Sequence, residues 1–285
     1  MEIHFWGTRG SIPAPGPHTL EFGGNTTCVE VVLSSGRRLV IDGGTGFRLL
    51  GQKLKEEGRP LFLHLLLTHG HWDHLLGIPF FEPIYQKETE IMVEGWVRAF
   101  QSLTRIFDNH LGNGFFPVAF HQLQAKIHFN PQMAHGPVDL DGAHISAVSL
   151  NHPQGGLGFR LQEGNSSLVF ITDNELGTAQ EQRFPEFVEF CQGCDLLIHD
   201  AQYLPEELPQ RRGWGHSSYE EAVHLAAQAG AGSLLLTHHD PSRTDSQVGE
   251  IIARARELAA TLRGDLEVDG AREGSAYRLP KLPEK

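Results

Sequence analysis

The sequence has few cysteines, no long apolar run and few basic residues for its length. Three cysteines in 285 residues cannot all pair, and Cys191 and Cys194 lack the second pair that would complete a zinc ribbon. We therefore expect small buried thiols. No apolar run reaches the roughly 18 residues that span a bilayer, and the first residues, MEIH, lack the pattern of a signal peptide. These absences predict a cytoplasmic protein with no membrane contact.

The charge balance bears on the kind of partner. Lys and Arg total 23 against 35 Asp and Glu, a formal net charge of −12. Contacts to nucleic-acid phosphates need clustered Lys and Arg, so this balance argues against nucleic acid as a partner. The hydrophobic fraction of 40% is ample for a core, and the length fits one large α/β domain or two small ones.

Histidine is plentiful, and four residues of metal-ligand type fall within six positions. These are His69, His71, Asp73 and His74, and they follow the apolar run 61–67, which predicts a strand buried on both faces. Side chains this close can converge on a divalent ion, and zinc suits a mixture of nitrogen and oxygen ligands. One catalytic zinc takes three protein ligands and keeps an open position. Four candidates therefore predict two adjacent metals, completed by residues from elsewhere.

Ligand-type residues recur at the ends of other predicted strands. The strands 143–150, 167–172, 195–200 and 233–237 end at or next to His152, Asp173, His199 with Asp200, and His238. A single domain that carries its ligands on one rim explains this repetition, whereas unrelated histidines do not. We therefore expect residues 1–285 to form one domain.

The remaining pattern predicts further elements with less chemistry. A hairpin is predicted over 28–41, and helices over 47–58, 75–85, 96–107, 219–229 and 246–262. The helix at 75–85 would place Asp73 and His74 at its N-terminus. Residues 96–125 are the least regular part, and core packing is the default interpretation for their aromatic side chains. The alternative is an insertion that acts as a lid or a homodimer contact.

Taken together, these motifs resemble the signature of the metallo-β-lactamase-fold hydrolases. The resemblance implies an α/β fold, a four-layer αββα sandwich, with metal-binding motifs spread along the chain. It assigns one zinc to His69, His71 and His152, a second to Asp73, His74 and His238, and a bridging position to Asp173. Asp42, in the first motif, would organise the metal loop through hydrogen bonds. His239 stays open as an alternative to His238.

Two elements resemble the phosphodiesterase members, which include ribonuclease Z. Residues 197–203, LIHDAQY, stand where those relatives carry His-Glu-Ala-Thr, and residues 215–218, GHSS, where they carry Gly-His-Ser-Thr. The resemblance makes His216 a candidate phosphate donor and general acid, supported by Asp200. Asp200 replaces the relatives' Glu and Gln202 their Thr. Residues 8–11 resemble an N-terminal loop that lies near the site mouth in these relatives.

The predicted function is a binuclear zinc hydrolase, with Mn²⁺ or Fe²⁺ as alternative metals. A hydroxide between the metals would attack a small cyclic or linear phosphodiester, with Asp73, His216 and Asp200 as the catalytic residues. No basic arm of the kind that ribonuclease Z uses on tRNA is evident, and the motifs look closest to phosphoribosyl cyclic phosphate phosphodiesterases. Three alternatives remain: a thioester or lactam hydrolase, a tRNA 3′-processing endonuclease, and a non-catalytic metal-dependent sensor.

Overall fold

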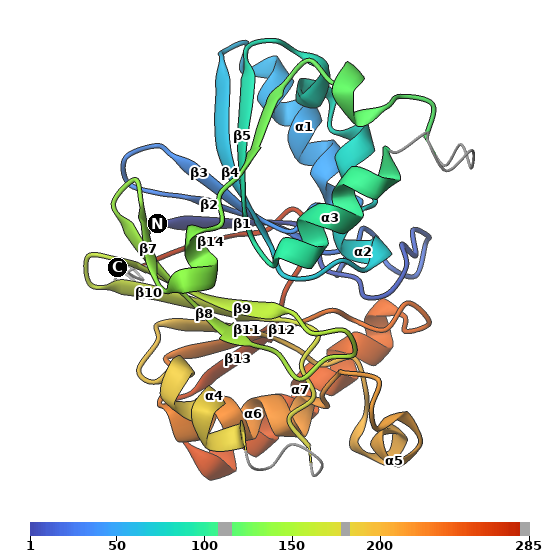
Figure 1. The fold of residues 1–285 in the computed structure, drawn as a ribbon. Helices are drawn as coiled ribbons and strands as arrows, with labels where there is room; N and C mark the ends of the chain where they lie inside the picture. Colours follow the sequence, from blue (N-terminus) through green and yellow to red (C-terminus); the bar gives the residue numbers. More distant parts are fainter. Residues whose placement is uncertain (108–115, 178–182, 280–285) are drawn as a thin grey trace.

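Two seven-stranded sheets packed face to face form the framework of the molecule (Figure 1). The structure, a computed structural model, describes residues 1–107, 116–177 and 183–279. The first sheet runs in the order β14 (Ala276–Arg278), β1 (Glu2–Gly7), β2 (Cys28–Val32), β3 (Arg38–Ile41), β4 (Leu61–Leu67), β5 (Thr89–Gly95) and β6 (Lys126–Phe129). The second runs in the order β13 (Glu267–Gly270), β12 (Ser233–Thr237), β11 (Leu196–Asp200), β10 (Ser166–Ile171), β9 (Leu157–Glu163), β8 (Ala143–Ser149) and β7 (Val138–Leu140).

Helices cover the outer face of each sheet (Figure 1). The α-helices are α1 (Gly46–Glu56), α2 (Trp72–Leu75), α3 (Val97–Ile106), α4 (Phe184–Cys191), α5 (Leu208–Arg211), α6 (Tyr219–Ala229) and α7 (Asp245–Leu262). The 3₁₀ helices are η1 (Ile78–Phe80), η2 (Glu82–Tyr85), η4 (Phe120–Gln122), η5 (Gln132–His135) and η7 (Pro205–Glu207). Helices α1 and α3 pack on the first sheet, and α4, α6 and α7 on the second. The predicted αββα class is confirmed.

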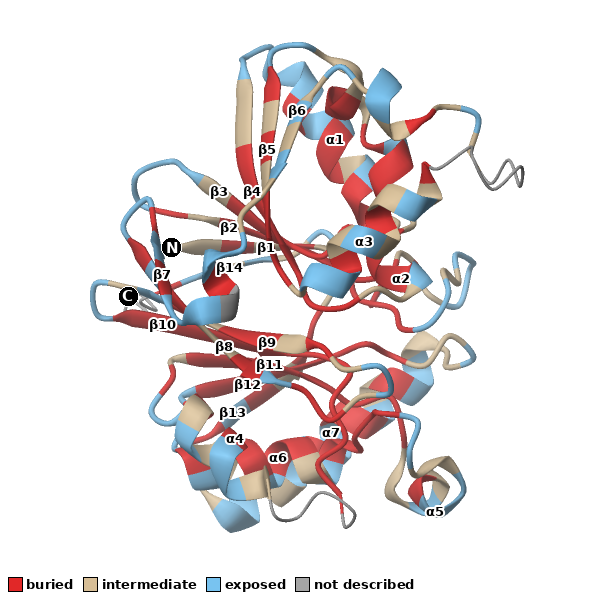
Figure 2. Cartoon of the chain, in the orientation of Figure 1, coloured by how far each residue is buried: buried red, intermediate tan, exposed pale blue. Residues whose placement is uncertain are grey.

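The main core lies between the two sheets. Alternation along β1 turns Ile3 and Phe5 inward, where they join a cluster with Phe159 and Ile198 of the second sheet. Figure 2 shows the buried strands facing each other across this layer. Each fully buried apolar side chain contributes about 1.5–3 kcal/mol to the stability of the fold. The packing of many such side chains in this layer therefore fixes the distance between the sheets. It thereby fixes how close the loops of one sheet come to the loops of the other.

Strand register aligns the ends that carry the ligand candidates. In the second sheet, β10, β11 and β12 are parallel, with Ile171 opposite His199 and Asp200 opposite Thr237. In the first sheet, β3 and β4 are parallel, with Ile41 opposite Leu66. Residues that follow these strands therefore emerge together at one edge of their sheet.

The segment after β4 differs from its prediction. In place of one helix over 75–85, the chain forms the short α2 and then two 3₁₀ helices. Pro79 and Pro83 lie at the starts of η1 and η2, where proline fits, but neither can continue an α-helix. Asp73 and His74 therefore lie within a four-residue helix, and not at the start of a long one.

Three other expectations can be placed on the structure. In the segment 96–125, α3 and η4 are present, whereas residues 108–115 lie outside the described part of the chain. Cys191 and Cys194 are buried and free of disulfides, as expected. Among the residues that the structure describes, no helix combines the length and the apolar character needed to cross a bilayer.

Candidate metal centre

Every residue predicted as a metal ligand lies in one of two adjoining groups, and His216 forms a third possible group with His152 and Asp173. We call the first the three-histidine cluster: His69, His71 and His152. We call the second the carboxylate cluster: Asp73, His74, Asp173 and His238. Each cluster takes side chains from both sheets, because residues 69–74 follow β4 whereas His152, Asp173 and His238 follow β8, β10 and β12.

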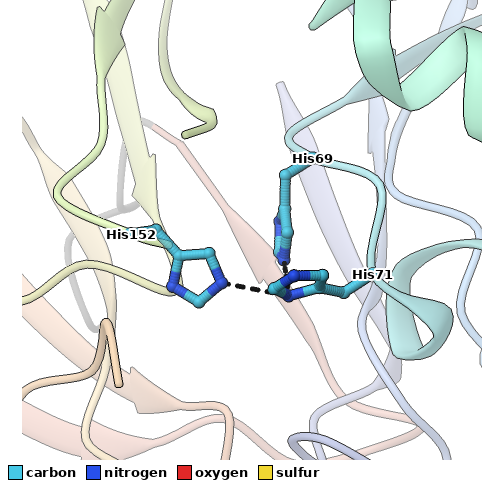
Figure 3. Close-up of side chains that lie close together, drawn as sticks. All are labelled: His69, His71 and His152. Carbon is cyan, nitrogen blue, oxygen red and sulfur yellow. Dashed lines mark hydrogen bonds between the residues drawn. The ribbon is translucent and has the colours of Figure 1, made fainter. Parts of the chain in front are cut away.

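In the three-histidine cluster, two rings point at the same nitrogen of a third (Figure 3). The Nε2 atoms of His69 and His152 each lie 3.0 Å from Nδ1 of His71. Tetrahedral zinc with Zn–N bonds of 2.0–2.1 Å places its nitrogen ligands about 3.3 Å apart. The three rings therefore already have nearly the spacing that a shared ion requires.

Hydrogen bonds on the far side of the rings support that interpretation. Nδ1 of His152 donates to the carbonyl of Gly215 at 3.0 Å. Nδ1 of His69 lies 3.1 Å from the Thr68 hydroxyl, which donates its own hydrogen to Asp42. Both histidines therefore present an Nε2 without a hydrogen, and His71 Nδ1 can satisfy only one of them. A cation among the three nitrogens satisfies all of them, so the donor set fits a divalent metal.

The pKa values of these histidines favour the neutral form that binds metal. Burial lowers the pKa of His69 well below its ordinary value. Burial also lowers the pKa of His152, to about 4. Neutral imidazole is the form that coordinates a metal, so these two rings are ready to bind near pH 7.

The carboxylate cluster is more deeply buried. His74 and His238 are fully buried, Asp173 is 2% exposed and Asp73 is 5% exposed. Nε2 of His74 lies 3.3 Å from Asp73 Oδ2 and 3.3 Å from Asp173 Oδ2. Nε2 of His238 lies 3.1 Å from Asp73 Oδ2 and 3.3 Å from Asp173 Oδ1. The two carboxylates are thus enclosed by the two imidazoles.

Asp42 orients this cluster from behind. Its Oδ2 accepts a hydrogen bond from Nδ1 of His74 at 2.7 Å and from the Thr68 hydroxyl at 2.7 Å. Because Nδ1 of His74 donates, its Nε2 is left for the cluster, and no described group hydrogen-bonds that buried nitrogen. Asp42 therefore has the contacts expected of a residue that organises the metal loop, and the unpartnered Nε2 of His74 fits a metal ligand.

The backbone is strained at the turns that deliver these side chains. Asp42, Asp173 and His238 have φ of 59°, 58° and 56°, in the left-handed region that non-glycine residues rarely adopt. Such a conformation costs about 1–3 kcal/mol for each residue and persists only where the surroundings impose it. Asp42 and His238 directly follow β3 and β12, and Asp173 follows β10 by two residues, so the left-handed turns direct these side chains from the strand ends into the centre.

His216 lies against both clusters. Its ring stacks on His238 at 5.0 Å and meets His152 edge to face at 5.4 Å. Nδ1 of His216 is 3.8 Å from Asp173 Oδ1 and 3.7 Å from Asp200 Oδ2, and it has no hydrogen-bond partner among the described residues. Asp200 therefore lies near His216 without hydrogen-bonding to it. Asp200 instead accepts hydrogen bonds from backbone N–H groups of Asn174 and Ser217.

The structure also separates the two adjacent histidines 238 and 239. His239 turns away from the clusters, with Nε2 at 3.3 Å from the carbonyl of Ala271 and its ring against Phe22. Burial lowers the pKa of His239 to about 3, which keeps it neutral. Only His238 of the pair reaches the carboxylate cluster.

Two contacts to the clusters were not predicted. Gln202 hydrogen-bonds His238, and the backbone N–H of Ser11 donates to Asp73. The sequence carried a signal for each, because Gln202 departs from the pattern of the phosphodiesterase members and residues 8–11 resemble a loop at the site mouth. Neither signal indicated which residue of the clusters Gln202 or Ser11 would contact.

A surface cleft of about 420 Å³ opens beside His152. Its lining combines apolar Leu150 and Pro153 with polar Asn151 and Glu175. The Glu175 carboxylate accepts hydrogen bonds from the backbone N–H groups of Gly213 and Gly215. The cleft is large enough for one part of a small substrate whose reacting group lies at the clusters.

Comparison with known proteins adds the family. Residues 37–239 match the family model described as the Beta-lactamase superfamily domain. The chain is 25% identical to a ribonuclease Z of Bradyrhizobium sp. (strain ORS 278), with 92% of this chain and 96% of that protein covered. It is 23% identical to a ribonuclease Z of Haloarcula marismortui, with 98% and 97% covered.

Solved structures share the fold across nearly the whole chain. The metallo-β-lactamase-fold protein YhfI from Bacillus subtilis matches with a TM-score of 0.70 at 20% identity, with 97% of this chain and 98% of that chain covered. A diphosphatase from the PhnP family matches with a TM-score of 0.67 at 19% identity, with 98% and 97% covered. Human tRNase Z, short form, matches with a TM-score of 0.63 at 20% identity, with 99% and 100% covered.

Proposed function

The chain belongs to the beta-lactamase superfamily, as a metal-dependent hydrolase of the branch that includes ribonuclease Z, and on that premise we propose that it cleaves phosphodiesters. The observation that carries the proposal is His216, an imidazole that lies against both clusters without belonging to the predicted ligand set. Cleavage of a phosphodiester needs a donor for a phosphate oxygen or the leaving oxygen, and His216 lies beside the centre with no hydrogen-bond partner for its Nδ1 among the described residues.

We assign the metals by cluster. His69, His71 and His152 would hold one Zn²⁺; Asp73, His74 and His238 would hold a second, and Asp173 contacts both clusters. Mn²⁺ or Fe²⁺ are the alternative ions for this donor set. When bound, the metals supply Lewis-acid chemistry that activates water and neutralises charge on the attacked group. Because each cluster takes ligands from both sheets, we propose that residues 1–285 act as one domain.

The chain's own residues then have separate tasks. Asp73 and Asp173 supply the negative charge of the carboxylate cluster: burial alone would raise the pKa of Asp73, but the neighbouring His74 and His238 lower it well below its usual value. His216 turns Nδ1 toward Asp173 and Asp200, which leaves Nε2 for a phosphate oxygen or the departing oxygen. A ring that donates there carries hydrogen on both nitrogens, because Nδ1 faces carboxylates. Asp200 fixes the loop before α6 through Ser217 and so sets the position of His216.

For the substrate we propose a small cyclic or linear phosphodiester. The size of the cleft beside His152 supports it. The charge balance predicted that nucleic acid is not a partner, and that prediction is not supported, because the sequence relatives that cover most of this chain are named ribonuclease Z. A tRNA 3′-processing endonuclease is therefore the second candidate function.

The first experiment measures hydrolysis of bis(p-nitrophenyl) phosphate by protein loaded with Zn²⁺ or Mn²⁺. We expect Asp73→Ala to abolish turnover together with metal at the carboxylate cluster. We expect His216→Ala to lower turnover by about 10²- to 10⁴-fold, the usual range for a general acid, with metal content unchanged. His144→Ala is the matched control, because His144 is an exposed histidine at the opposite end of β8 from His152.

The outcomes separate the candidate functions. Full turnover in Asp73→Ala would contradict the proposal. A loaded protein that leaves the diester intact would favour thioesters, lactams or a metal-dependent sensor. If the diester is cleaved, a panel of cyclic nucleotides, sugar cyclic phosphates and a precursor tRNA transcript distinguishes the small substrate from the RNA.

A further inference from the structure

Gln202 lies in the loop that follows β11, 4% exposed and adjacent to the carboxylate cluster. Both ends of its side-chain amide are engaged. Oε1 lies 3.0 Å from Nδ1 of His238, and Nε2 donates to the Ser11 hydroxyl at 3.1 Å. One buried amide therefore joins a candidate ligand of the second sheet to the N-terminal loop.

The first contact decides which nitrogen of His238 carries hydrogen. An amide oxygen only accepts hydrogen bonds, so Nδ1 of His238 must donate to it. In the neutral ring, Nε2 then bears a lone pair, and it faces Asp73 Oδ2 at 3.1 Å and Asp173 Oδ1 at 3.3 Å. Three electron-rich atoms face one another there, which is the arrangement that a cation stabilises.

The second contact reaches Asp73 through Ser11. The backbone N–H of Ser11 donates to Asp73 Oδ2 at 2.8 Å, and Ser11 has a φ of 61°, in the left-handed region. A serine keeps this conformation only if its surroundings hold it there. Gln202 restrains Ser11 in this conformation, because its Nε2 donates to the Ser11 hydroxyl while the Ser11 N–H donates to Asp73.

The preceding residues hold the same loop against His238. Gly10 packs so closely that an added Cβ would lie 2.4 Å from Nδ1 of the His238 ring. The backbone N–H of Gly10 donates to the carbonyl of His239 at 2.9 Å. Arg9 is fully buried and donates to the carbonyls of Gly23, Asp240 and Arg243. These contacts hold the loop in one position, and Gln202 connects the loop to the carboxylate cluster.

We infer that Gln202 is a positioning residue that selectively sets the metal affinity of the carboxylate cluster. It orients His238 directly and Asp73 through Ser11, while its side-chain hydrogen bonds to described residues go to His238 and Ser11, neither of which belongs to the three-histidine cluster. The inference rests on the metal centre of the proposed function, but not on its substrate. It explains how this chain uses a position where the phosphodiesterase relatives carry threonine.

The test is zinc binding by the full chain, measured by competition with a chromophoric chelator. In Gln202→Leu, which removes both hydrogen bonds, we expect the affinity for one zinc equivalent to fall about 10- to 100-fold, the usual effect of losing an outer partner of a ligand. The other equivalent keeps its affinity. Gln202→Glu retains an acceptor for Nδ1 of His238 and recovers part of the loss, and Ser11→Ala gives a smaller loss at the same equivalent.

Gln162→Leu is the matched control, because Gln162 is an exposed glutamine on β9. Co²⁺ titration followed by visible absorption gives an independent record of the altered site. Equal weakening of both zinc equivalents in Gln202→Leu, or unchanged binding of both, overturns the inference. If that variant does not fold, Gln202→Glu and Ser11→Ala decide it by the same criterion of one equivalent against two.

The outcome is separable from that of the proposed function. A wild-type protein that binds two zinc ions but leaves bis(p-nitrophenyl) phosphate intact contradicts the proposed function and leaves this inference open to its own test. A wild-type protein that binds a single zinc equivalent overturns this inference, whatever its activity.

Discussion

The two clusters of the metal centre lie side by side but are built from different chemistry. The three-histidine cluster is neutral, and two of its members, His71 and His152, are partly exposed. The carboxylate cluster is fully buried and holds two acids, Asp73 and Asp173. Burying carboxylates is costly unless a cation or a donor compensates each charge. The carboxylate cluster should therefore depend on its surroundings and on metal far more than its neighbour does.

The residues that hydrogen-bond the cluster members from outside also differ between the two clusters. The carboxylate cluster is braced by Asp42 behind His74, by Gln202 behind His238 and by Ser11 beside Asp73. In the three-histidine cluster, the described outer contacts to His69 and His152 are the Thr68 hydroxyl and the Gly215 carbonyl. Where charge is buried, the chain uses partners from three separate segments: the side chains of Asp42 and Gln202 and the backbone N–H of Ser11. The following predictions test this difference, from the largest expected effect to the smallest.

The largest effect is expected for Asp173→Ala. Oδ1 of Asp173 lies 3.8 Å from Nε2 of His69 and 3.3 Å from Nε2 of His238, so this carboxylate contacts both clusters. We expect turnover and the zinc content of both clusters to fall by more than the roughly 10- to 100-fold typical of an outer partner. Metal analysis after dialysis, with Asp139→Ala as the exposed control, checks this. Loss of one zinc alone would show that Asp173 serves a single cluster.

The second prediction compares His74→Ala with His71→Ala in metal-free protein. Burial lowers the pKa of His74, but the charges of Asp73, Asp173 and Asp42 outweigh it and raise that pKa well above its usual value. Without metal, protonated His74 compensates the buried acids, so its loss should lower the free energy of unfolding by about 3–5 kcal/mol. The described hydrogen bonds of His71 go to His69 and His152 rather than to an acid, and we expect a clearly smaller loss. Urea unfolding of the two variants would contradict the comparison if the losses were equal.

The third prediction concerns Asp42→Asn, which keeps the shape but removes the charge behind His74. We expect the affinity for the zinc of the carboxylate cluster to fall about 10- to 100-fold, while the three-histidine cluster keeps its metal. Competition with a chelator measures both equivalents in one titration. Asp141→Asn, a change at an acid remote from both clusters, should leave both affinities unchanged. An effect on the three-histidine cluster alone would mean that Asp42 acts through Thr68 and His69.

The smallest effect comes from a histidine between two acids outside the centre. Nδ1 of His64 lies 3.2 Å from Glu94 and Nε2 lies 3.2 Å from Asp141. Both ring nitrogens are therefore engaged by carboxylates, and neither is left to bind a metal. Burial lowers the pKa of His64, but the hydrogen bonds and charges of Glu94 and Asp141 outweigh it, and the net pKa is raised. Its stabilisation is therefore complete below the unfolded pKa, about 6.5, and is lost as the pH rises through the raised value.

The measurement is the difference in the free energy of unfolding between wild type and His64→Gln at pH 6 and at pH 9. We expect a difference of about 1 kcal/mol at pH 6 that shrinks at pH 9. Effects of pH on the metal centre are common to both proteins and cancel in the difference. A gap that widens with pH would show that His64 is buried in its neutral form.

Much of the fold and of the ligand set could be predicted because both depend on local pattern. The strand 61–67 appears with the predicted bounds; His69 and His71 lie in the loop that follows it, and Asp73 and His74 in the short helix α2. The strands before His152, Asp173 and His238 were also predicted, and parallel register then aligns the last two. The helix predicted over 75–85 was wrong, because apolar spacing outweighed the two prolines in that prediction.

Local pattern could not predict contacts between segments far apart in the sequence. The partners Gln202 and Ser11 are separated by 191 positions, and His238 and Asp73 by 165. Each contact depends on how the two sheets pack and on left-handed turns at single residues. Local pattern also could not predict that the distance from His216 to Asp200 is too long for a hydrogen bond.

By itself, then, the sequence determined the strands that precede the ligand-type residues and that those residues follow the strand ends, because burial and turn chemistry act over a few neighbouring residues. Strands β5, β6, β7 and β13 were not predicted. Only the tertiary structure decided how those residues divide into a neutral and an anionic cluster, and that His238 rather than His239 faces inward. It also decided that Gln202 braces the anionic cluster. The physical reason is that hydrogen bonds and metal sites require positions good to a fraction of an ångström, which only the packing of both sheets around one core can set.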